Sequence, residues 1–348
     1  MRAEGGRGDE SRAERAGQLL MVAEPAGGSG GALDAAIRNQ HVGNVFFLGG
    51  WTGRAQVSAT AKRLAAAAGP STGEVGLLVA ADQEGGAVQQ LKGEGFTRIP
   101  SARVQANGSP AAVTQTFRTV GAELKATGVN VDLAPVADAV PASLGKANKP
   151  IGYWGREYAS TPAQAAPFVA AATRGLRSAG VAATVKHFPG LGRITGNTDL
   201  TTEGITDSVT TGSAADLAAF KAGIDAGAQL VMVSSARYPK IDPDNQAVFS
   251  PKVIQGALRQ GLGYDGVVTT DDVAAVALQG TPAGQRATRF VASGGDLLVV
   301  GQVGLARPMA SALVAKAAAD PAFAAKVTAS ATRIVTLKTT LGLTPCKR

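Results

Sequence analysis

The chain has 348 residues, of which 45% are hydrophobic and 17% are charged. This composition supports a large buried core and excludes an intrinsically disordered protein, which has few apolar residues and a high net charge. The net charge of +8 would suit an anionic partner, but Lys and Arg occur singly or in short pairs and aromatic residues make up only 5%. Because nucleic-acid binding typically needs a basic run or an aromatic stacking surface, we expect no nucleic-acid partner.

The single cysteine, Cys346, excludes an intramolecular disulfide and a multi-cysteine metal site. No apolar stretch approaches the roughly 20 residues that span a membrane. We expect residues 1–14 to form a flexible leader and residues 15–348 to form one domain, because no linker divides the chain. The leader lacks the apolar segment of a signal peptide, so two locations stay open. We favour an exported protein, located in the cell envelope or outside the cell, over a cytoplasmic one.

Eight short apolar runs, rich in β-branched residues, are predicted as strands. They lie at residues 18–22, 44–48, 76–81, 130–134, 182–187, 229–234, 266–270 and 296–300. Ala-rich amphipathic segments between them are predicted as helices. These lie at residues 54–68, 111–127, 162–179, 214–226 and 251–260, with a final helix at 321–341. Several of the helices end at glycine, and a helix followed by a buried apolar strand is typical of parallel βα units.

Eight strands that alternate with helices predict an α/β protein with a single-domain (β/α)8 barrel of the TIM type, the last helix packing outside it. An open doubly wound sheet is the structural alternative, because periodicity alone does not close a barrel. Polar residues cluster directly after five of the strands. They are Asp82-Gln83-Glu84, Asp138, Lys186-His187, Ser234-Ser235 and Asp271-Asp272. Barrel active sites are built at the carboxyl ends of the strands, so we expect these residues to meet at one mouth.

Single acidic residues at the start of a loop are usually helix caps or solvated turns. Asp82, however, directly follows a buried strand and precedes two glycines, which let the backbone approach a ligand closely. Lys186-His187 ends another strand and runs into a Pro-Gly bend. Carboxylates, a cation and an imidazole on one rim favour sugar binding or proton transfer. Paired carboxylates in a barrel mouth suggest glycoside hydrolysis.

Metal and phosphate chemistry find little support in the sequence. The chain has two histidines, His41 and His187, so a zinc site would need mostly carboxylate ligands, which is unusual. Magnesium or calcium held by acidic residues stays possible, but no EF-hand loop, Walker motif or G-x-S-x-G elbow occurs. We expect neither a metal nor another cofactor.

Four strings then occur in order along the chain: ADQEGG at residues 81–86, VDLAPVAD at 131–138, KHFPG at 186–190 and VVTTDD at 267–272. Together they resemble family 3 glycoside hydrolases, in particular the single-barrel β-N-acetylglucosaminidases that trim cell-wall sugars. The resemblance covers roughly residues 15–340. It implies a retaining exo-acting enzyme on N-acetylglucosamine-containing glycans or muropeptides. A monomer is the default for a lone barrel.

The resemblance also implies roles for individual residues. Asp271 matches the catalytic nucleophile, which forms a covalent glycosyl-enzyme and retains the anomeric configuration. Asp82 matches the carboxylate that binds hydroxyls on the far edge of the sugar ring. Lys186 and His187 match a pair that hydrogen-bonds the same ring, and Arg156 matches an arginine of the substrate pocket.

One string departs from the family pattern. The family usually continues K-H-F-P-G-H-G and, four residues later, D-S-H, whose histidine is the acid/base. Here His187 is kept but Leu191 replaces the second histidine of the first string, and Asn197 and Asp199 stand in place of the Asp–His pair. His41 precedes the second strand, so we expect it at the opposite end of the barrel. We therefore interpret Asp199 as the acid/base, because burial or a nearby charge can raise a carboxyl pKa toward neutrality.

Three alternatives stay open at this stage. Glu203 and Asp207, later in the same loop, are further candidates for the acid/base. The loop could also have lost its proton donor, which would leave a catalytically impaired sugar-binding envelope protein on the same barrel. A β-glucosidase is a minor alternative. In addition, Ala87 and Gln90 stand where the family often has arginine, so support for the segment around Glu84 is in question.

Overall fold

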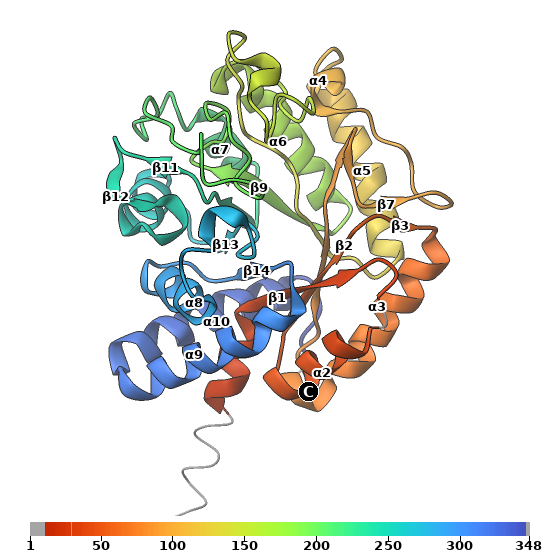
Figure 1. Cartoon of the computed structure of the whole chain (residues 1–348). Helices are drawn as coiled ribbons and strands as arrows, with labels where there is room; N and C mark the ends of the chain where they lie inside the picture. The colour runs from red at the N-terminus through yellow and green to blue at the C-terminus, as the bar shows by residue number, and fades with distance from the viewer. Residues whose placement is uncertain (1–10, 29, 346–348) are drawn as a thin grey trace, which may run out of the picture.

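The computed structural model describes residues 11–28 and 30–345 (Figure 1). Residues 1–10 of the expected leader, together with Cys346, lie outside the described residues. Residues 11–18 form a helix that precedes the first strand, so the end of the expected leader is helical.

Eight parallel strands form one sheet in which each strand pairs with the next along the chain. They are β1 (Leu20–Pro25), β2 (Asn44–Leu48), β4 (Leu78–Ala81), β8 (Val131–Asp132), β9 (Ala182–Phe188), β10 (Leu230–Val233), β13 (Val267–Thr270) and β14 (Leu298–Val300). The last strand, β14, pairs back with β1. Between β13 and β14, a bridge joins Thr269 to Leu297, and the Thr270 N–H donates to the Leu297 carbonyl at 2.9 Å. The predicted barrel is therefore confirmed as a nearly closed barrel, and the open sheet is not observed.

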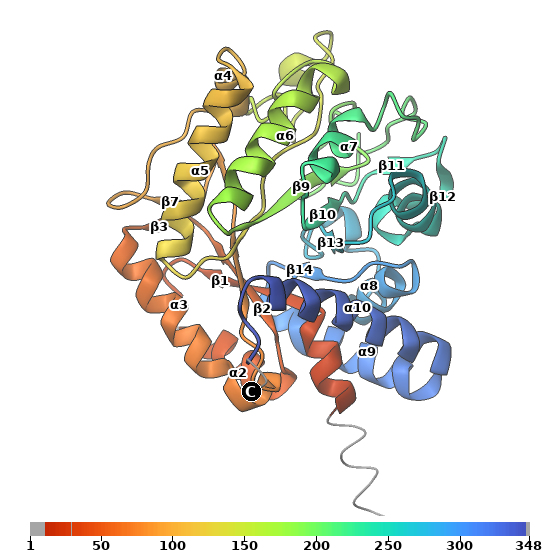
Figure 2. The same ribbon diagram turned by 180° about the vertical axis from the view of Figure 1, so that it is seen from behind.

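Helices surround this barrel in both views (Figures 1 and 2). They are α2 (Gly31–Gln40), α3 (Arg54–Ala68), α5 (Pro110–Ala126), α6 (Pro162–Ser178), α7 (Ala218–Asp225), α8 (Ala283–Ala292), α9 (Ala306–Ala319) and α10 (Pro321–Thr340). The segment predicted as a helix at 251–260 is a π-helix, η4 (Lys252–Gly261). No helix of residues 11–28 and 30–345 is both long and apolar enough to cross a membrane.

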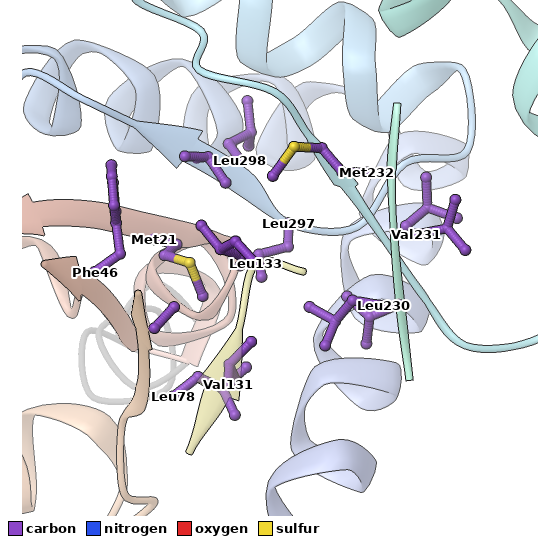
Figure 3. Packing of buried hydrophobic residues seen from close by; sticks show 14 of the residues in the cluster. Met21, Phe46, Leu78, Val131, Leu133, Leu230, Val231, Met232, Leu297 and Leu298 are labelled. Carbon is purple, nitrogen blue, oxygen red and sulfur yellow. The ribbon is translucent and has the colours of Figure 1, made fainter. Parts of the chain in front are cut away.

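The interior of the barrel is filled with apolar side chains from successive strands (Figure 3). Met21, Leu133 and Leu297 come from three separate segments and converge at its centre (Figure 3). All three are at most 1% exposed. The barrel is therefore a packed core with functional groups only at its end, as is usual for this fold.

One predicted strand, at residues 130–134, is shortened to β8, which has two residues. Pro135 has no N–H to continue the ladder, so the chain leaves regular pairing there. It stays beside β9 through irregular bonds, in which the Lys186 N–H donates to the Pro135 carbonyl at 3.1 Å and the Ala137 N–H donates to the Lys186 carbonyl at 2.6 Å. This path places Asp138 next to the end of β9.

Candidate active site

A cavity of about 240 Å³ lies at the carboxyl ends of the barrel strands. All six residues predicted from the sequence line it: Asp82, Arg156, Lys186, His187, Asp199 and Asp271. Apolar side chains that include Phe46, Leu133, Met232 and Val299 complete the wall. The cavity wall therefore takes residues in or directly after seven of the eight barrel strands.

A buried charge network forms one side of the cavity. The Lys186 ammonium contacts a carboxylate oxygen of Asp82 and lies 2.6 Å from Glu84 Oε1. Arg156 donates to both oxygens of Glu84, at 2.8 Å from Nε and 2.7 Å from Nη2. Burial alone would raise the pKa of Glu84, but Arg156 and Lys186 hold it at about 2. Glu84 thus stays ionised and balances two buried cations, which fixes both of them at the cavity wall.

His187 is held by Asp138, which is fully buried. Asp138 Oδ2 lies 2.7 Å from His187 Nδ1, and its Oδ1 accepts the Leu191 N–H at 2.7 Å. We assign the proton to Nδ1, because a carboxylate can only accept there. Nε2 is then left as an acceptor, 3.4 Å from Arg156 Nη2. Asp138 therefore orients the imidazole and also anchors the loop that follows β9.

The two carboxylates that follow β13 have different surroundings. Asp272 Oδ1 accepts the N–H groups of Ala274 and Gly301, both at 2.8 Å, so this side chain braces the ends of β13 and β14. Burial raises the pKa of Asp272. Asp271 Oδ1 accepts the Asp272 N–H at 2.9 Å, and its side chain lines the cavity.

The loop that carries Asp199 is attached to the segment that follows Asp271. The carbonyl oxygens of Thr198 and Asp199 accept the N–H groups of Ala277 at 3.0 Å and Val276 at 3.2 Å. Those two residues belong to η5 (Val276–Leu278), a short 3-10 turn after β13. These backbone contacts attach the Asp199 loop to the segment that follows Asp271. Asp199 and Asp271 are 72 residues apart in the sequence, yet both line the same cavity.

The electrostatic environment of Asp199 suits proton transfer. This residue is partly open to solvent, and it lines the cavity together with Asp271 and Asp272. Burial, and then the negative charges of Asp271 and Asp272, raise the pKa of Asp199 to about 7. An acid with this pKa can both donate and accept a proton near neutral pH.

The other candidates for the acid/base lie away from the cavity. Glu203 is exposed and does not line it. Asp207 is buried in a turn, where its Oδ1 accepts the N–H groups of Val209 at 2.8 Å and Thr210 at 3.0 Å. Neither of these two further candidates lines the cavity, so the structure favours Asp199 over them as the acid/base.

Two other residues singled out in the sequence are also outside the cavity. His41 ends α2 just before β2, as expected for the opposite end of the barrel, and its Nδ1 lies 2.7 Å from the Ser71 carbonyl oxygen. Ser234, at a strand end, does not reach the cavity because its hydroxyl lies 2.9 Å from the Tyr238 hydroxyl.

The segment around Glu84 keeps its support without the arginines of the family pattern. Arg156 and Lys186 bind Glu84 directly, as described above. Gln90 Oε1 accepts the N–H groups of Gly49 at 3.0 Å and Gly50 at 2.9 Å, so this side chain holds the turn that follows β2. Ala87 is exposed and forms no part of the cavity wall.

A further buried acid, Asp132, was not singled out in the sequence analysis. Its Oδ1 accepts the Gln83 N–H at 3.0 Å, and its Oδ2 has no hydrogen-bond partner among the residues described. Burial raises the pKa of Asp132 to about 8, despite the bond from Gln83. It therefore carries a proton at neutral pH. Across residues 11–28 and 30–345, no group of three or more His, Cys, Asp or Glu side chains is arranged to hold a metal ion.

Comparison with known proteins identifies relatives of the whole barrel. A β-hexosaminidase of Stenotrophomonas maltophilia is 36% identical over 233 residues, which are 64% of this chain and 66% of that protein. The chain thus spans just under two thirds of this curated relative. The crystal structure of a β-N-acetylhexosaminidase from Beutenbergia cavernae is similar over 94% of this chain and 98% of that chain, with 45% identity and a TM-score of 0.92.

A second solved structure is a family 3 β-N-acetylglucosaminidase from Paenibacillus, with 28% identity and a TM-score of 0.82 over 95% of this chain and 62% of that chain. The model of the glycosyl hydrolase family 3 N-terminal domain matches residues 12–337. That range contains every strand of the barrel and all six cavity residues predicted above. The chain therefore belongs to glycosyl hydrolase family 3, and the predicted membership of this family of glycoside hydrolases is confirmed.

Proposed function

We propose that the protein is a retaining, exo-acting β-N-acetylglucosaminidase that releases terminal N-acetylglucosamine from peptidoglycan fragments. The observation that carries this proposal is the pairing of Asp271 with Asp199 on one cavity, where Asp199 has a pKa of about 7. A retaining glycosidase needs one ionised carboxylate and one group that carries a proton.

In the first step, the Asp271 carboxylate attacks the anomeric carbon while Asp199 gives its proton to the glycosidic oxygen. The bond from the anomeric carbon to that oxygen breaks, and the leaving sugar departs with the proton. The product is an ester between the sugar and Asp271. In the second step, the Asp199 carboxylate takes a proton from water, whose oxygen attacks the anomeric carbon and releases Asp271. Two inversions return the original β configuration.

The buried network holds the sugar for this chemistry. Asp82 and Lys186 offer an acceptor and a donor to ring hydroxyls, and His187 offers a second polar atom beside them. The cavity of about 240 Å³ is small for an extended glycan and ends against the network of Lys186, Glu84 and Arg156, which supports removal of one terminal sugar at a time.

The sugar and its source have separate support. The name of the 45% identical structural relative supports an N-acetylated hexosamine. The peptidoglycan origin extends the resemblance to enzymes that trim cell-wall sugars, as noted from the sequence motifs.

The test measures release of N-acetylglucosamine from an N-acetylglucosamine–N-acetylmuramic acid disaccharide and from an aryl N-acetyl-β-glucosaminide. We expect wild type to cleave both, and Asp271→Asn to lose on the order of 10³-fold or more, because removal of a nucleophile abolishes the covalent step. The matching aryl β-glucoside should be a poorer substrate. Equal rates for wild type and Asp271→Asn would contradict the assignment of Asp271 as the nucleophile. Calorimetric binding of N-acetylglucosamine without any turnover would favour the sugar-binding alternative.

A further inference from the structure

The exposed apolar side chains of this protein are concentrated on one part of its surface. Among the residues described, the five exposed large hydrophobic ones are Val104 (54%), Tyr153 (47%), Trp154 (49%), Leu200 (75%) and Val209 (55%). Single exposed apolar residues are normal and need no explanation. All five, however, lie on the three consecutive connections that follow β4, β8 and β9, which are loops of the cavity end of the barrel.

Tyr153 and Trp154 stand on a turn whose two ends belong to the cavity wall. Pro150 and Arg156 flank this turn, and both line the cavity. Because consecutive Cα atoms are 3.8 Å apart, the Trp154 Cα lies within about 8 Å of the Arg156 Cα. The two aromatic rings pack edge to face, with their centroids 4.9 Å apart. Two half-exposed aromatic side chains therefore stand on a turn that begins and ends at the cavity wall.

Hydrogen bonds on the inner side of the turn hold it in place. The Ile151 carbonyl accepts the Trp154 N–H at 3.1 Å, and the Arg103 guanidinium donates to the Gly152 carbonyl at 2.9 Å. Ile151 and Gly152 are buried, whereas the aromatic rings are half exposed. A platform already held in place loses little conformational entropy when a ligand binds.

Asn148 joins this turn to the loop that carries Asp199. Its Nδ2 donates to the carbonyls of Leu191 and Ile194, both at 2.7 Å. Its Oδ1 accepts the N–H groups of Ile151 at 3.0 Å and Gly152 at 2.7 Å. The aromatic turn and the start of the Asp199 loop therefore form one block.

The proposed role of Asp199 as the proton donor indicates which part of the substrate lies next to the aromatic turn and the Asp199 loop. An acid that protonates the glycosidic oxygen lies beside the bond that breaks, so the leaving group extends outward past Asp199. Leu200 directly follows Asp199 and is the most exposed of the five apolar residues. We call Tyr153 and Trp154 the aromatic rim.

We propose that the aromatic rim binds the apolar face of the leaving-group sugar ring, so that the substrate is recognised by two adjacent pyranose rings. This inference rests on the proposed function. Aromatic side chains that have one apolar face and one wet edge suit such a ligand. Lys149 lies 4.9 Å from the centre of the Tyr153 ring, which adds a positive charge for a leaving sugar that bears a carboxylate.

The experiment compares two substrates that differ only in the leaving group. One is the disaccharide of two β-1,4-linked N-acetylglucosamine rings, and the other is the trifluoroethyl N-acetyl-β-glucosaminide, whose leaving group has no ring. For Trp154→Ala and the double variant with Tyr153→Ala, we expect kcat/KM for the disaccharide to fall about tenfold more than for the trifluoroethyl glycoside, a typical effect of losing a stacked aromatic ring. Trp154→Phe should keep most of the activity on the disaccharide.

The control is Val209→Ala, which removes an exposed apolar side chain outside the rim and should leave the ratio of the two substrates at the wild-type value. Equal losses of kcat/KM on both substrates, or no loss in the double variant, would contradict the proposed role of the rim in binding the leaving group. A wild type that cleaves neither substrate would instead overturn the proposed function, and a binding measurement then tests the rim separately.

Tryptophan fluorescence supplies that measurement. The chain has two tryptophans, and Trp51 is buried with its indole N–H on the Glu24 carbonyl, so Trp154 is the one that meets a ligand from solvent. In Asp271→Asn, we expect the disaccharide to shift the emission and N-acetylglucosamine alone to leave it unshifted. An unshifted emission with saturating disaccharide would contradict the rim whatever the catalytic activity.

Discussion

Asp199 and Asp271 face the same cavity but are set up for different tasks. The carboxylate of Asp199 is desolvated and repelled by Asp271 and Asp272, which brings its pKa to about 7. A carboxyl group that holds a proton near neutral pH is suited to the role of general acid. In the proposed mechanism, the carboxylate at position 199 therefore takes the role of the histidine of the family pattern.

This assignment gives a defined pH dependence. Because the general acid must carry its proton, we expect kcat/KM for the disaccharide to fall as the pH rises through about 7, by about tenfold per pH unit. Asp199→Asn should lose roughly 10²–10⁴-fold on the disaccharide and far less on an aryl glycoside, which leaves with little protonation. If kcat/KM of Asp199→Asn still fell as the pH rises through about 7, another acid, such as Asp132, would be responsible. That result would contradict the role of Asp199 as the general acid.

At this scale, motifs identified the residues at the cavity end of the barrel but not which of them bind one another. Arg156 was predicted as a pocket residue, and the structure adds that it donates twice to Glu84, which is 72 positions earlier. The support that Asp138 gives to His187 likewise joins positions 49 apart. Such pairs depend on how the strand ends are arranged in space, and one sequence contains no direct signal for them.

The elements were predicted best where burial repeats along the chain. The strand at 44–48 and the helix at 54–68 have the predicted bounds, because a short buried apolar run and an Ala-rich amphipathic segment each favour one structure. The shortening of β8 follows from Pro135, a signal that was visible in the sequence. The π-helix was not predictable, because its residues have the same amphipathic pattern as an α-helix.

The loop that presents Asp199 is an element with its own constraint. The N–H groups of Thr195 and Gly196 both bind the Gly204 carbonyl, at 3.0 and 2.9 Å, which closes the loop at its base. A Cβ atom on Gly196 would lie 1.9 Å from the Glu203 carbonyl oxygen. The loop can therefore close only with glycine at this position.

We expect Gly196→Ala to open the base of the loop and displace Asp199, lowering kcat on the disaccharide about 10- to 100-fold, because a misplacement of about 1 Å costs on the order of 10² in rate. Circular dichroism should show a folded barrel. Gly280→Ala is the matched control, since its Cβ would meet nothing within 4 Å. Equal kcat values for the two variants would show that the closed base does not position the acid.

On the scale of the whole molecule, the C-terminal helix is tied to the start of the barrel. Lys338, in α10, is fully buried, and its ammonium donates to Gln18 Oε1 at 2.6 Å and to the Gly43 carbonyl at 2.8 Å. None of these partners is a carboxylate, and burial lowers the pKa of Lys338 to about 7. Helix α10 is thus attached next to the amino ends of β1 and β2, at the end of the barrel opposite the cavity.

This buried lysine links stability to pH. Between about pH 7 and the ordinary lysine pKa of 10.5, the unfolded chain holds a proton that the folded chain lacks, so the free energy of unfolding rises with pH. We measure the free energy of unfolding in urea at pH 7 and at pH 9. From the lower to the higher pH, the value for wild type should rise relative to the value for Lys338→Met, by up to about 1.4 kcal/mol per pH unit. Lys326→Met, an exposed change on the same helix, should keep the wild-type slope. If the free energy of unfolding of Lys338→Met depended on pH as it does in wild type, the lowered pKa of Lys338 would be contradicted.

The central claim is that Asp271 forms a bond to the sugar and that Asp199 serves both steps of the reaction. Mass spectrometry of Asp199→Asn mixed with an aryl N-acetyl-β-glucosaminide tests it most directly. The aryl leaving group departs without help from a general acid, so the first step still occurs in this variant. The second step is slow, because no general base activates the attacking water. The ester should therefore accumulate, as one added N-acetylglucosamine unit on the peptide that contains Asp271. A label on another peptide, or turnover without any accumulated ester, would contradict the account.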